Sequence, residues 1–148
     1  MNIGSGNGYP AAALSNFSPH PFVFDGVAVA SMEGLLQAFK FDKLPIQIEV
    51  CKLVGRAAKK RGSKKNWQER QTLWWAGQPY ARKGDPYQAL LDRAYWTMFH
   101  GSESFRNALK ASSKAVLTHT IGRSDKSETV LTRSEFCSRL TKMRATLL

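Results

Sequence analysis

The chain reads Ser31-Met32-Glu33-Gly34-Leu35-Leu36-Gln37-Ala38-Phe39-Lys40-Phe41 near its start, and this stretch decides the fold. Ser31 is a favourable N-cap, so we expect a helix from here to about residue 43. Side chains three and four residues apart share one face of a helix. The apolar face holds Met32, Leu35, Leu36 and Phe39, and a polar row beside it holds Glu33, Gln37 and Lys40. An ordered polar row predicts a functional surface; the alternative is that Glu33 only stabilises the first turn through the helix dipole.

The chain has 148 residues, 43% of them apolar, and a net charge of +11. This length suits one domain with a hydrophobic core. A strongly basic balance predicts an anionic partner, such as nucleic acid, a nucleotide or another polyphosphate. The densest basic run contains Lys52, Arg56, Lys59, Lys60, Arg61, Lys64 and Lys65. The alternative is a solvated helix face followed by a basic loop, because charge alone gives neither specificity nor chemistry.

The first residues of the chain have a composition of their own. Residues 1–12 are predicted to form a flexible tail, because the first eight are rich in Gly, Asn and Ser, and residues 13–148 are predicted to form a single domain.

No apolar run reaches membrane-spanning length and no secretory signal is visible, so we expect a cytoplasmic protein without a membrane partner. Cys51 and Cys137 form no disulfide framework, and the histidines lack metal-ligand spacing. We expect no metal and no cofactor, and the oligomeric state stays open.

Hydrophobic periodicity and turn residues predict the remaining elements. Asp25-Gly26 between two short apolar runs is a β-hairpin signal. Helices are expected over residues 45–60, 65–76, 86–98 and 102–111, and a capping box at Thr132 and Glu135 opens a last helix. A strand is expected over residues 115–121. The sum is an α+β fold, a compact and mostly helical single domain with a few short strands.

Several familiar catalytic motifs do not occur in this sequence. It has no phosphate-binding glycine loop, no dinucleotide fingerprint and no nucleophile elbow. Neither cysteine has the basic setting that activates a thiol. What remains is Glu33, with amides, cations and tryptophans nearby in the sequence.

The residues around Glu33 resemble the NADAR family, also called YbiA-like. The resemblance rests on Leu14-Ser15-Asn16-Phe17, on Asp25-Gly26 and on the spacing Ser31-x-Glu33-x-x-x-Gln37-x-x-Lys40-Phe41. Weaker similarity at Lys65-Asn66-Trp67 and near the C-terminus extends it over residues 13–147. The resemblance implies a compact α+β domain. It also implies an N-glycosidase that hydrolyses a phosphorylated ribosyl or ADP-ribosyl conjugate, such as a riboflavin-pathway intermediate or ADP-ribosylated guanine, which makes nucleic acid a candidate partner.

The resemblance also suggests which residues form the site. An ionised carboxylate beside the C1′ atom of ribose stabilises the positive charge that forms as the C1′–N bond breaks, or accepts a proton from water. We assign this catalytic role to Glu33 and expect Asp125 to be its acidic partner. The substrate-binding candidates are Asn16, Phe17, Gln37, Lys40, Arg61, Lys65, Asn66 and Trp67. Alternatives are core packing for Trp67, a turn role for Asn16 and a surface ion pair for Lys40.

Three departures from the family pattern favour alternatives to catalysis. Gly34 stands where the family usually has a histidine, Met98 stands where it has the lysine of a Lys-Phe pair, and the Trp of its later Trp-Gly-x-Gly segment is missing. The first alternative is a non-catalytic binding module for an NAD-derived nucleotide such as ADP-ribose. The second is a basic nucleic-acid binder with a degenerate pocket.

Overall fold

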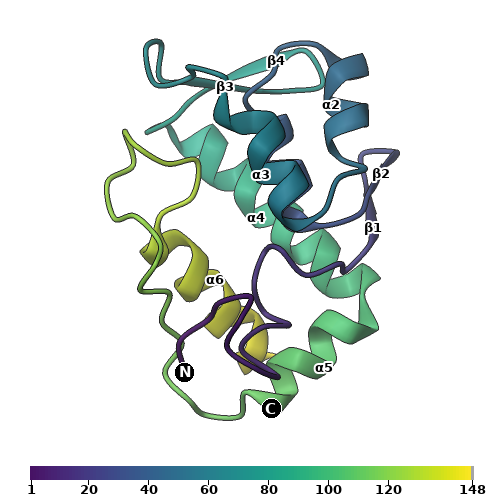
Figure 1. The fold of residues 1–148 in the computed structure, drawn as a ribbon, viewed down its shortest axis with the longest axis vertical. Helices are drawn as coiled ribbons and strands as arrows, with labels where there is room; N and C mark the ends of the chain where they lie inside the picture. The colour runs from purple at the N-terminus through teal and green to yellow at the C-terminus, as the bar shows by residue number, and fades with distance from the viewer. Residues whose placement is uncertain (148) are drawn as a thin grey trace.

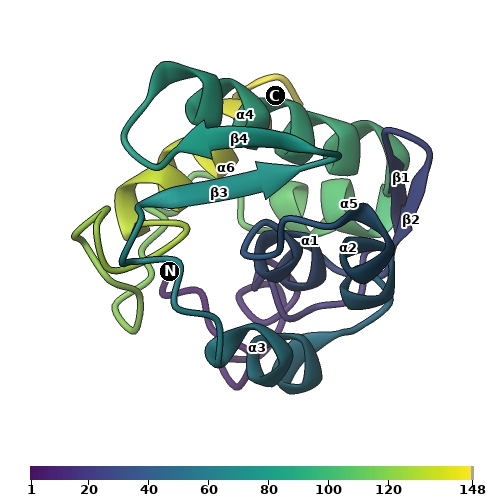
Figure 2. The same cartoon turned by 90° about the horizontal axis from the view of Figure 1, so that it is seen from above.

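Helices and two separate β-hairpins surround one hydrophobic core in the computed structural model, which describes residues 1–147 (Figure 1). In chain order the elements are β1 (Phe22–Phe24), β2 (Val27–Val29), α1 (Met32–Ala38), α2 (Leu44–Val50), α3 (Gly55–Ser63), β3 (Thr72–Trp75), β4 (Gln78–Ala81), α4 (Asp85–Gly101), α5 (Glu103–Ala111) and α6 (Arg133–Ala145). Seen from above, the β3–β4 hairpin lies on one side of the molecule and α3 on the other (Figure 2). The predicted α+β fold is confirmed.

The first hairpin sets the start of α1. Asp25 and Gly26 have positive φ angles of 49° and 79°, as a two-residue turn between twisted strands requires. After β2, the Ser31 hydroxyl accepts a hydrogen bond from the Gly34 amide at 3.2 Å. Both the hairpin and the N-cap are therefore as the sequence predicts. The cap fixes the first turn of α1, which carries Glu33.

The single helix predicted over residues 45–60 is wrong, because two helices occupy this range. α2 ends at Val50 and α3 begins at Gly55, whose φ of 58° is accessible to glycine without strain. The apolar pattern runs across this break and conceals it. The break reverses the chain, so that both α2 and α3 pack against α1.

The helix predicted over residues 65–76 is also wrong, because β3 and β4 form an antiparallel hairpin there. Ala76 and Gly77 take positive φ angles of 49° and 85° and make the turn. Leu73 and Trp75 are buried, whereas Trp74 between them is partly exposed, which is the period of two of a strand. A short apolar run does not distinguish this period from a helical one, so the sequence misleads here.

The long helix α4 packs against β1, β4, α5 and α6. Its buried face includes Tyr87, Leu91 and Tyr95, which belong to the common core. α5 lies where the sequence predicts a helix, and α6 begins with the predicted capping box at Thr132 and Glu135. The helix α4 therefore connects one strand of each hairpin to the two C-terminal helices.

The N-terminal residues do not form the free tail predicted for residues 1–12. Ile3 is fully buried, and its amide donates a hydrogen bond to the Thr118 carbonyl at 2.8 Å. Asn2 and Thr118 form an isolated parallel bridge, which replaces the strand predicted over residues 115–121. Composition misled the prediction, because the partner of this segment lies far away in the sequence. The N-terminal segment therefore packs as part of the domain predicted over residues 13–148. Residue 148 of that domain lies outside the described residues. Within the described part, no helix has both the length and the hydropathy to cross a membrane.

Candidate active site

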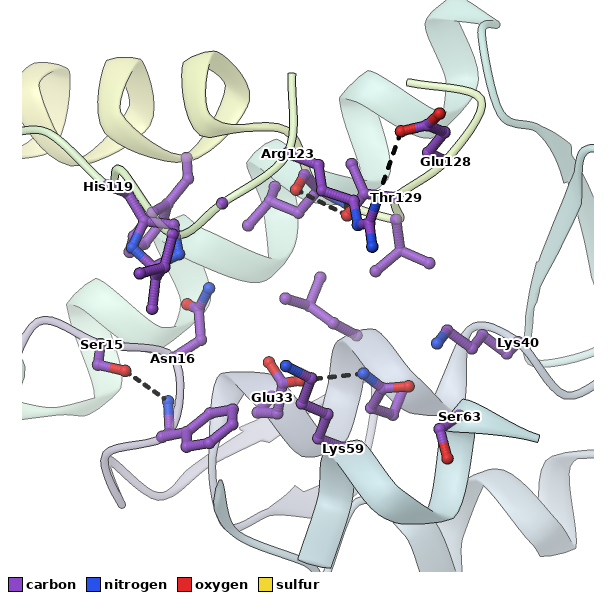
Figure 3. Close-up of a pocket in the computed structure, with 18 of the residues that line it drawn as sticks. Ser15, Asn16, Glu33, Lys40, Lys59, Ser63, His119, Arg123, Glu128 and Thr129 are labelled. Atoms are coloured by element: carbon purple, nitrogen blue, oxygen red, sulfur yellow. Dashed lines mark hydrogen bonds and ion pairs between the residues drawn. The ribbon is translucent and has the colours of Figure 1, made fainter. Parts of the chain in front are cut away.

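A cavity of about 310 Å³ lies between α1, α3 and the loop that precedes α6. Figure 3 shows Glu33 and Lys59 on one wall, and Arg123 and Thr129 on the facing wall. His119 and Lys40 lie on opposite sides of Glu33 in the same view. The cavity therefore brings one carboxylate together with several cations from elements that are distant in the sequence.

Glu33 sits in the first turn of α1, where two contacts fix it. Its backbone amide donates to the Asn16 carbonyl at 3.0 Å, and its Oε1 accepts a hydrogen bond from Gln37 Nε2 at 2.9 Å. Burial raises the pKa of Glu33, although the hydrogen bond from Gln37 and the charges of Lys40 and Lys59 oppose this shift. A carboxylate in such a setting is a stronger base than one on the surface.

Gln37 owes its position to Gly62 on α3. The Gln37 Oε1 atom is buried and has no hydrogen-bond partner among the described residues. A Cβ atom at residue 62 would lie 1.8 Å from this oxygen, so only glycine leaves room for the Gln37 side chain. The close approach of α3 to α1 therefore directs the Gln37 amide nitrogen at Glu33.

Asn16 lines the cavity next to Glu33 and is held from behind. The Tyr95 hydroxyl on α4 donates to Asn16 Oδ1 at 2.8 Å. This bond occupies the amide oxygen and leaves the amide nitrogen as a donor for a ligand. Phe17 follows in the same wall, and a Cβ atom at Gly55 would lie 3.7 Å from its ring. The Ser-Asn-Phe segment thus contributes both a polar and an apolar contact to the cavity.

Three cations line the cavity: Lys40, Lys59 and Arg123. Burial lowers the pKa of Lys40, the charge of Lys59 lowers it further, and the charge of Glu33 raises it. The Lys40 ammonium makes a long contact of 3.4 Å with the Gly62 carbonyl. Arg123 is exposed and paired with Glu128 at 3.5 Å. Such loosely held cations are suited to bind phosphate.

The structure brings six of the predicted site residues to this cavity: Asn16, Phe17, Glu33, Gln37, Lys40 and Trp67. Trp67 is almost fully buried and belongs to the hydrophobic core, so both its predicted core role and its place at the site apply. The motif spacing around Glu33 therefore located one wall of the cavity. The opposite wall comes from residues that the sequence analysis did not select.

Four predicted site residues lie elsewhere. Asp125 is exposed and outside the cavity, and its Oδ1 atom accepts hydrogen bonds from the Ser127 amide and hydroxyl at 2.9 and 2.8 Å. Asn66 also turns away, since its Oδ1 accepts a bond from the Glu69 amide at 3.3 Å. The structure therefore does not bring Asp125 to Glu33, because the polar loop around Asp125 closes on itself.

Arg61 and Lys65 lie on the outer face of α3 and its C-terminal end, again outside the cavity. The Arg61 guanidinium and the Lys65 ammonium lie 4.7 and 5.4 Å from the centre of the Phe41 ring. Together with Lys60 and Lys64 they line a second hollow. These two cations therefore form part of a basic surface beside the cavity and not a wall of it.

Gly34 is explained by the packing of α1 against the chain that follows α2. A Cβ atom at this position would lie 2.7 Å from the Leu53 carbonyl oxygen and 3.1 Å from that of Val50. A larger side chain has no room there without a shift of the backbone. The absence of a histidine at residue 34 is thus coupled to this local path of the chain.

His119, Lys59, Arg123 and Thr129 are cavity residues that the site prediction missed. Lys59 carried a signal, because it belongs to the basic run. His119 and Arg123 carried no site signal, since His119 lies in the segment predicted as a strand and Arg123 in the polar loop that follows it. His119 is held at the cavity by a hydrogen bond of 2.8 Å between its Nδ1 and the carbonyl of Ile3, which joins the N-terminal segment to the loop before α6.

This arrangement of helices and hairpins has a known counterpart. The chain superposes on the NMR structure of the Escherichia coli protein YbiA with a TM-score of 0.64 and 17% sequence identity, covering 99% of this chain and 83% of that one. The expected YbiA-like fold is therefore confirmed. The chain belongs to the family described as bacteriophage protein GP30.3, which matches residues 8–145. It is also 37% identical over 149 residues to an uncharacterized 17.1 kDa protein from the Gp30–rIII intergenic region of enterobacteria phage T4, covering 99% of this chain and 98% of that protein.

Proposed function

We propose that the protein is an N-glycosidase that hydrolyses the N-glycosidic bond of a phosphorylated ribosyl or ADP-ribosyl conjugate. One observation carries the proposal. A partly buried carboxylate, Glu33, faces a cavity that also holds Lys40, Lys59 and Arg123. The carboxylate suits a ribose C1′ atom that becomes positively charged, and the cations suit its phosphate. The resemblance of the Glu33 motif to the NADAR family supports the same activity.

The reaction needs a base and a charge stabiliser, and Glu33 serves as both. As the C1′–N bond breaks, its electron pair leaves with the nitrogen and the ribose gains oxocarbenium character. The ionised Glu33 stabilises that charge and takes a proton from the water that bonds to C1′. The raised pKa of Glu33 strengthens it as a base, and the charges of Lys40 and Lys59 favour its ionised form. Asn16 offers its amide nitrogen to a ribose hydroxyl or to the base.

The cavity volume supports a substrate that extends beyond it. A volume of about 310 Å³ lies at the lower end of the range of about 300–1,000 Å³ for small-molecule sites. A ribosyl phosphate fits such a space, whereas a larger conjugate must continue along the protein surface. The basic run on and around α3 is the surface next to the cavity, since Lys59 and Ser63 of α3 line the cavity itself.

Nucleic acid is the larger partner that we propose for this surface. Lys60, Arg61, Lys64 and Lys65 are exposed, and within residues 1–147 none of them forms an ion pair. Binding of a phosphate backbone releases counterions, so it weakens steeply with salt. We expect added salt to slow hydrolysis of an ADP-ribosylated DNA and to affect a small conjugate much less. Equal salt sensitivity of both substrates would contradict this choice.

The test of the activity is release of the free base by the wild-type protein and by Glu33→Gln, followed by mass spectrometry over a panel of ribosyl and ADP-ribosyl conjugates. We expect Glu33→Gln to lower the rate by about 100- to 10,000-fold, the usual effect of removing such a group. Glu49→Gln on the exposed surface of α2 is the matched control and should keep the wild-type rate. Equal rates for Glu33→Gln and the wild type would exclude the mechanism.

The second candidate is a module that binds an NAD-derived nucleotide without cleaving it. One observation favours it: the predicted acidic partner Asp125 is not in the cavity. Calorimetry with ADP-ribose separates the two functions. A binding module gives saturable heat in both the wild type and Glu33→Gln, and the wild type releases no base from any conjugate of the panel.

A further inference from the structure

His119 is fixed in the cavity wall with one ring nitrogen bonded to the protein. Its Nδ1 lies 2.8 Å from the carbonyl oxygen of Ile3. A carbonyl oxygen only accepts hydrogen bonds, so Nδ1 carries a proton in either charge state. Nε2 is therefore the nitrogen that gains and loses a proton.

The imidazole ring is also held by packing on its other sides. The Phe136 ring stands edge-on to it, with ring centres 5.2 Å apart and planes at 79°. A Cβ atom at Gly122 would lie 2.6 Å from His119 Cδ2, so the backbone passes close to the ring. A ring with so little freedom presents Nε2 in one direction, as a preorganised catalytic group requires.

The other ionisable groups of the cavity already have a role or a partner. Glu33 acts on the ribose, and Lys40 and Lys59 are cations for the phosphate. Arg123 does not lose its proton in water, and Glu128 is exposed and pairs with it. Within the described residues, His119 is thus the cavity group left to protonate the departing nitrogen. His119 and Lys40 lie on opposite sides of Glu33 (Figure 3), so His119 is away from the side of the cavity where Lys40 would bind the phosphate.

We propose that His119 donates this proton. The C1′–N bond breaks with its electron pair on nitrogen, and the Nε2–H of the imidazolium gives its proton to that nitrogen. Water bonds to C1′ and loses a proton to Glu33. Ribose leaves with a C1′ hydroxyl and the base leaves protonated, after which solvent takes the proton from Glu33 and returns one to His119. This role rests on the proposed N-glycosidase function.

Several charged groups lie near His119. Glu33 from α1, Lys59 from α3 and Arg123 from the same loop line the same cavity, and Arg133 at the start of α6 lies beside Gly122 as His119 does. A proton donor works only while it is protonated, so the rate falls on the alkaline side of the pH profile. A variant that lacks the donor should not show this fall.

The experiment compares two leaving groups in the wild type, His119→Asn and Glu33→Gln. ADP-ribose joined to the exocyclic nitrogen of guanine needs a proton at that nitrogen. Nicotinamide mononucleotide releases neutral nicotinamide from a pyridinium and needs none. Asparagine keeps a side-chain N–H for the Ile3 carbonyl, and His119→Gln is the second variant if His119→Asn does not fold. His100→Asn, at the exposed end of α4, is the control.

We expect His119→Asn to hydrolyse the guanine conjugate at least about a hundredfold more slowly than the wild type, and its pH profile to lack the alkaline fall. On nicotinamide mononucleotide its rate should fall less than threefold. Glu33→Gln loses rate on both. An unchanged rate and alkaline limb, or equal losses on both substrates, overturns the role of His119 and leaves the proposed function intact. If the wild type hydrolyses only the guanine conjugate, its pH profile alone decides. If the wild type releases neither base, the proposed function and the role of His119 both fall.

Discussion

At the scale of the residue, Glu33 combines its proposed catalytic role with a cost in stability. Its pKa is higher in the folded protein than the ordinary value of 4.5, because burial opposes ionisation. Below this ordinary value the carboxyl is protonated in both folded and unfolded chains, and it costs nothing. As the pH rises through the folded pKa, the unfolded chain ionises more easily, and the free energy of unfolding falls. Catalytic carboxylates commonly carry such a cost.

Replacing Glu33 by Gln should therefore stabilise the protein at neutral pH while it removes activity. The amide oxygen of the new side chain can still accept the hydrogen bond from Gln37. We expect a higher Tm than that of the wild type at pH 7, and a difference that closes towards pH 4.5 and below. Thermal unfolding followed by circular dichroism across this range measures it. A lower Tm for the variant at pH 7 would contradict the burial of an ionised carboxylate.

Gly62 controls the same carboxylate through Gln37. A methyl group at residue 62 would collide with the Gln37 amide and move it away from Glu33. We expect Gly62→Ala to slow hydrolysis by about 10- to 100-fold, since a shift of one ångström at a reacting group has effects of this size. Gly6→Ala is the control, because a Cβ atom there meets nothing within 4 Å. If the effect acts through Gln37, Gly62→Ala adds little in a Gln37→Ala background.

At the scale of the element, a buried side chain joins α1 to the β3–β4 hairpin. Gln47 on α2 is fully buried, and its Nε2 donates to the carbonyls of Ala38, Phe41 and Trp74 at 3.1, 2.8 and 2.9 Å. Its Oε1 accepts from the Ala76 amide at 3.1 Å. This side chain satisfies backbone groups at the end of α1 and at the hairpin turn, which would otherwise be buried without partners.

Gln47→Leu should destabilise the protein by about 1–3 kcal/mol, because it leaves buried backbone groups without partners. The midpoint of urea unfolding measures the loss. Gln78→Leu on the exposed strand β4 is the matched control and should change stability little. A midpoint equal to that of the wild type would show that water or a local shift replaces the bonds of Gln47.

The elements that the sequence predicts correctly are those that depend on neighbouring residues. The helix at Ser31, the hairpin at Asp25-Gly26 and the capping box at Thr132 depend on neighbouring residues, and they were predicted correctly. The contacts of Gln47 and His119 depend on residues that are distant in the sequence, so no local pattern indicates them. One wall of the cavity was therefore predictable, and the wall formed by the loop before α6 was not.

At the scale of the whole molecule, a buried ion pair holds that second wall in place. Arg82 lies fully buried after β4 and makes two hydrogen bonds to Glu135 at the start of α6, at 2.6 and 3.1 Å. Its Nε also donates to the Thr129 carbonyl at 2.7 Å. Tyr87 on α4 donates to the neighbouring Val130 carbonyl at 2.6 Å. The core thus anchors the segment that closes the cavity.

This ion pair makes the stability of the protein sensitive to acid. Burial alone would raise the pKa of Glu135, but the hydrogen bonds from Arg82, Thr132 and Gln88 outweigh it and lower the pKa from 4.5 to about 2. The stabilisation is complete above pH 4.5 and is lost as the pH falls towards 2.

We expect Glu135→Gln to cost about 3–5 kcal/mol at pH 7, because it leaves the Arg82 charge buried without its partner. Urea titration measures the free energy of unfolding of Glu135→Gln and of the wild type. The difference between the two should become smaller at each step below pH 4.5. Asp92→Asn removes the exposed partner of Arg139 and should cost less than about 1 kcal/mol at every pH. A difference between Glu135→Gln and the wild type that stays constant down to the lowest pH would mean that Glu135 acts through packing and not through its charge.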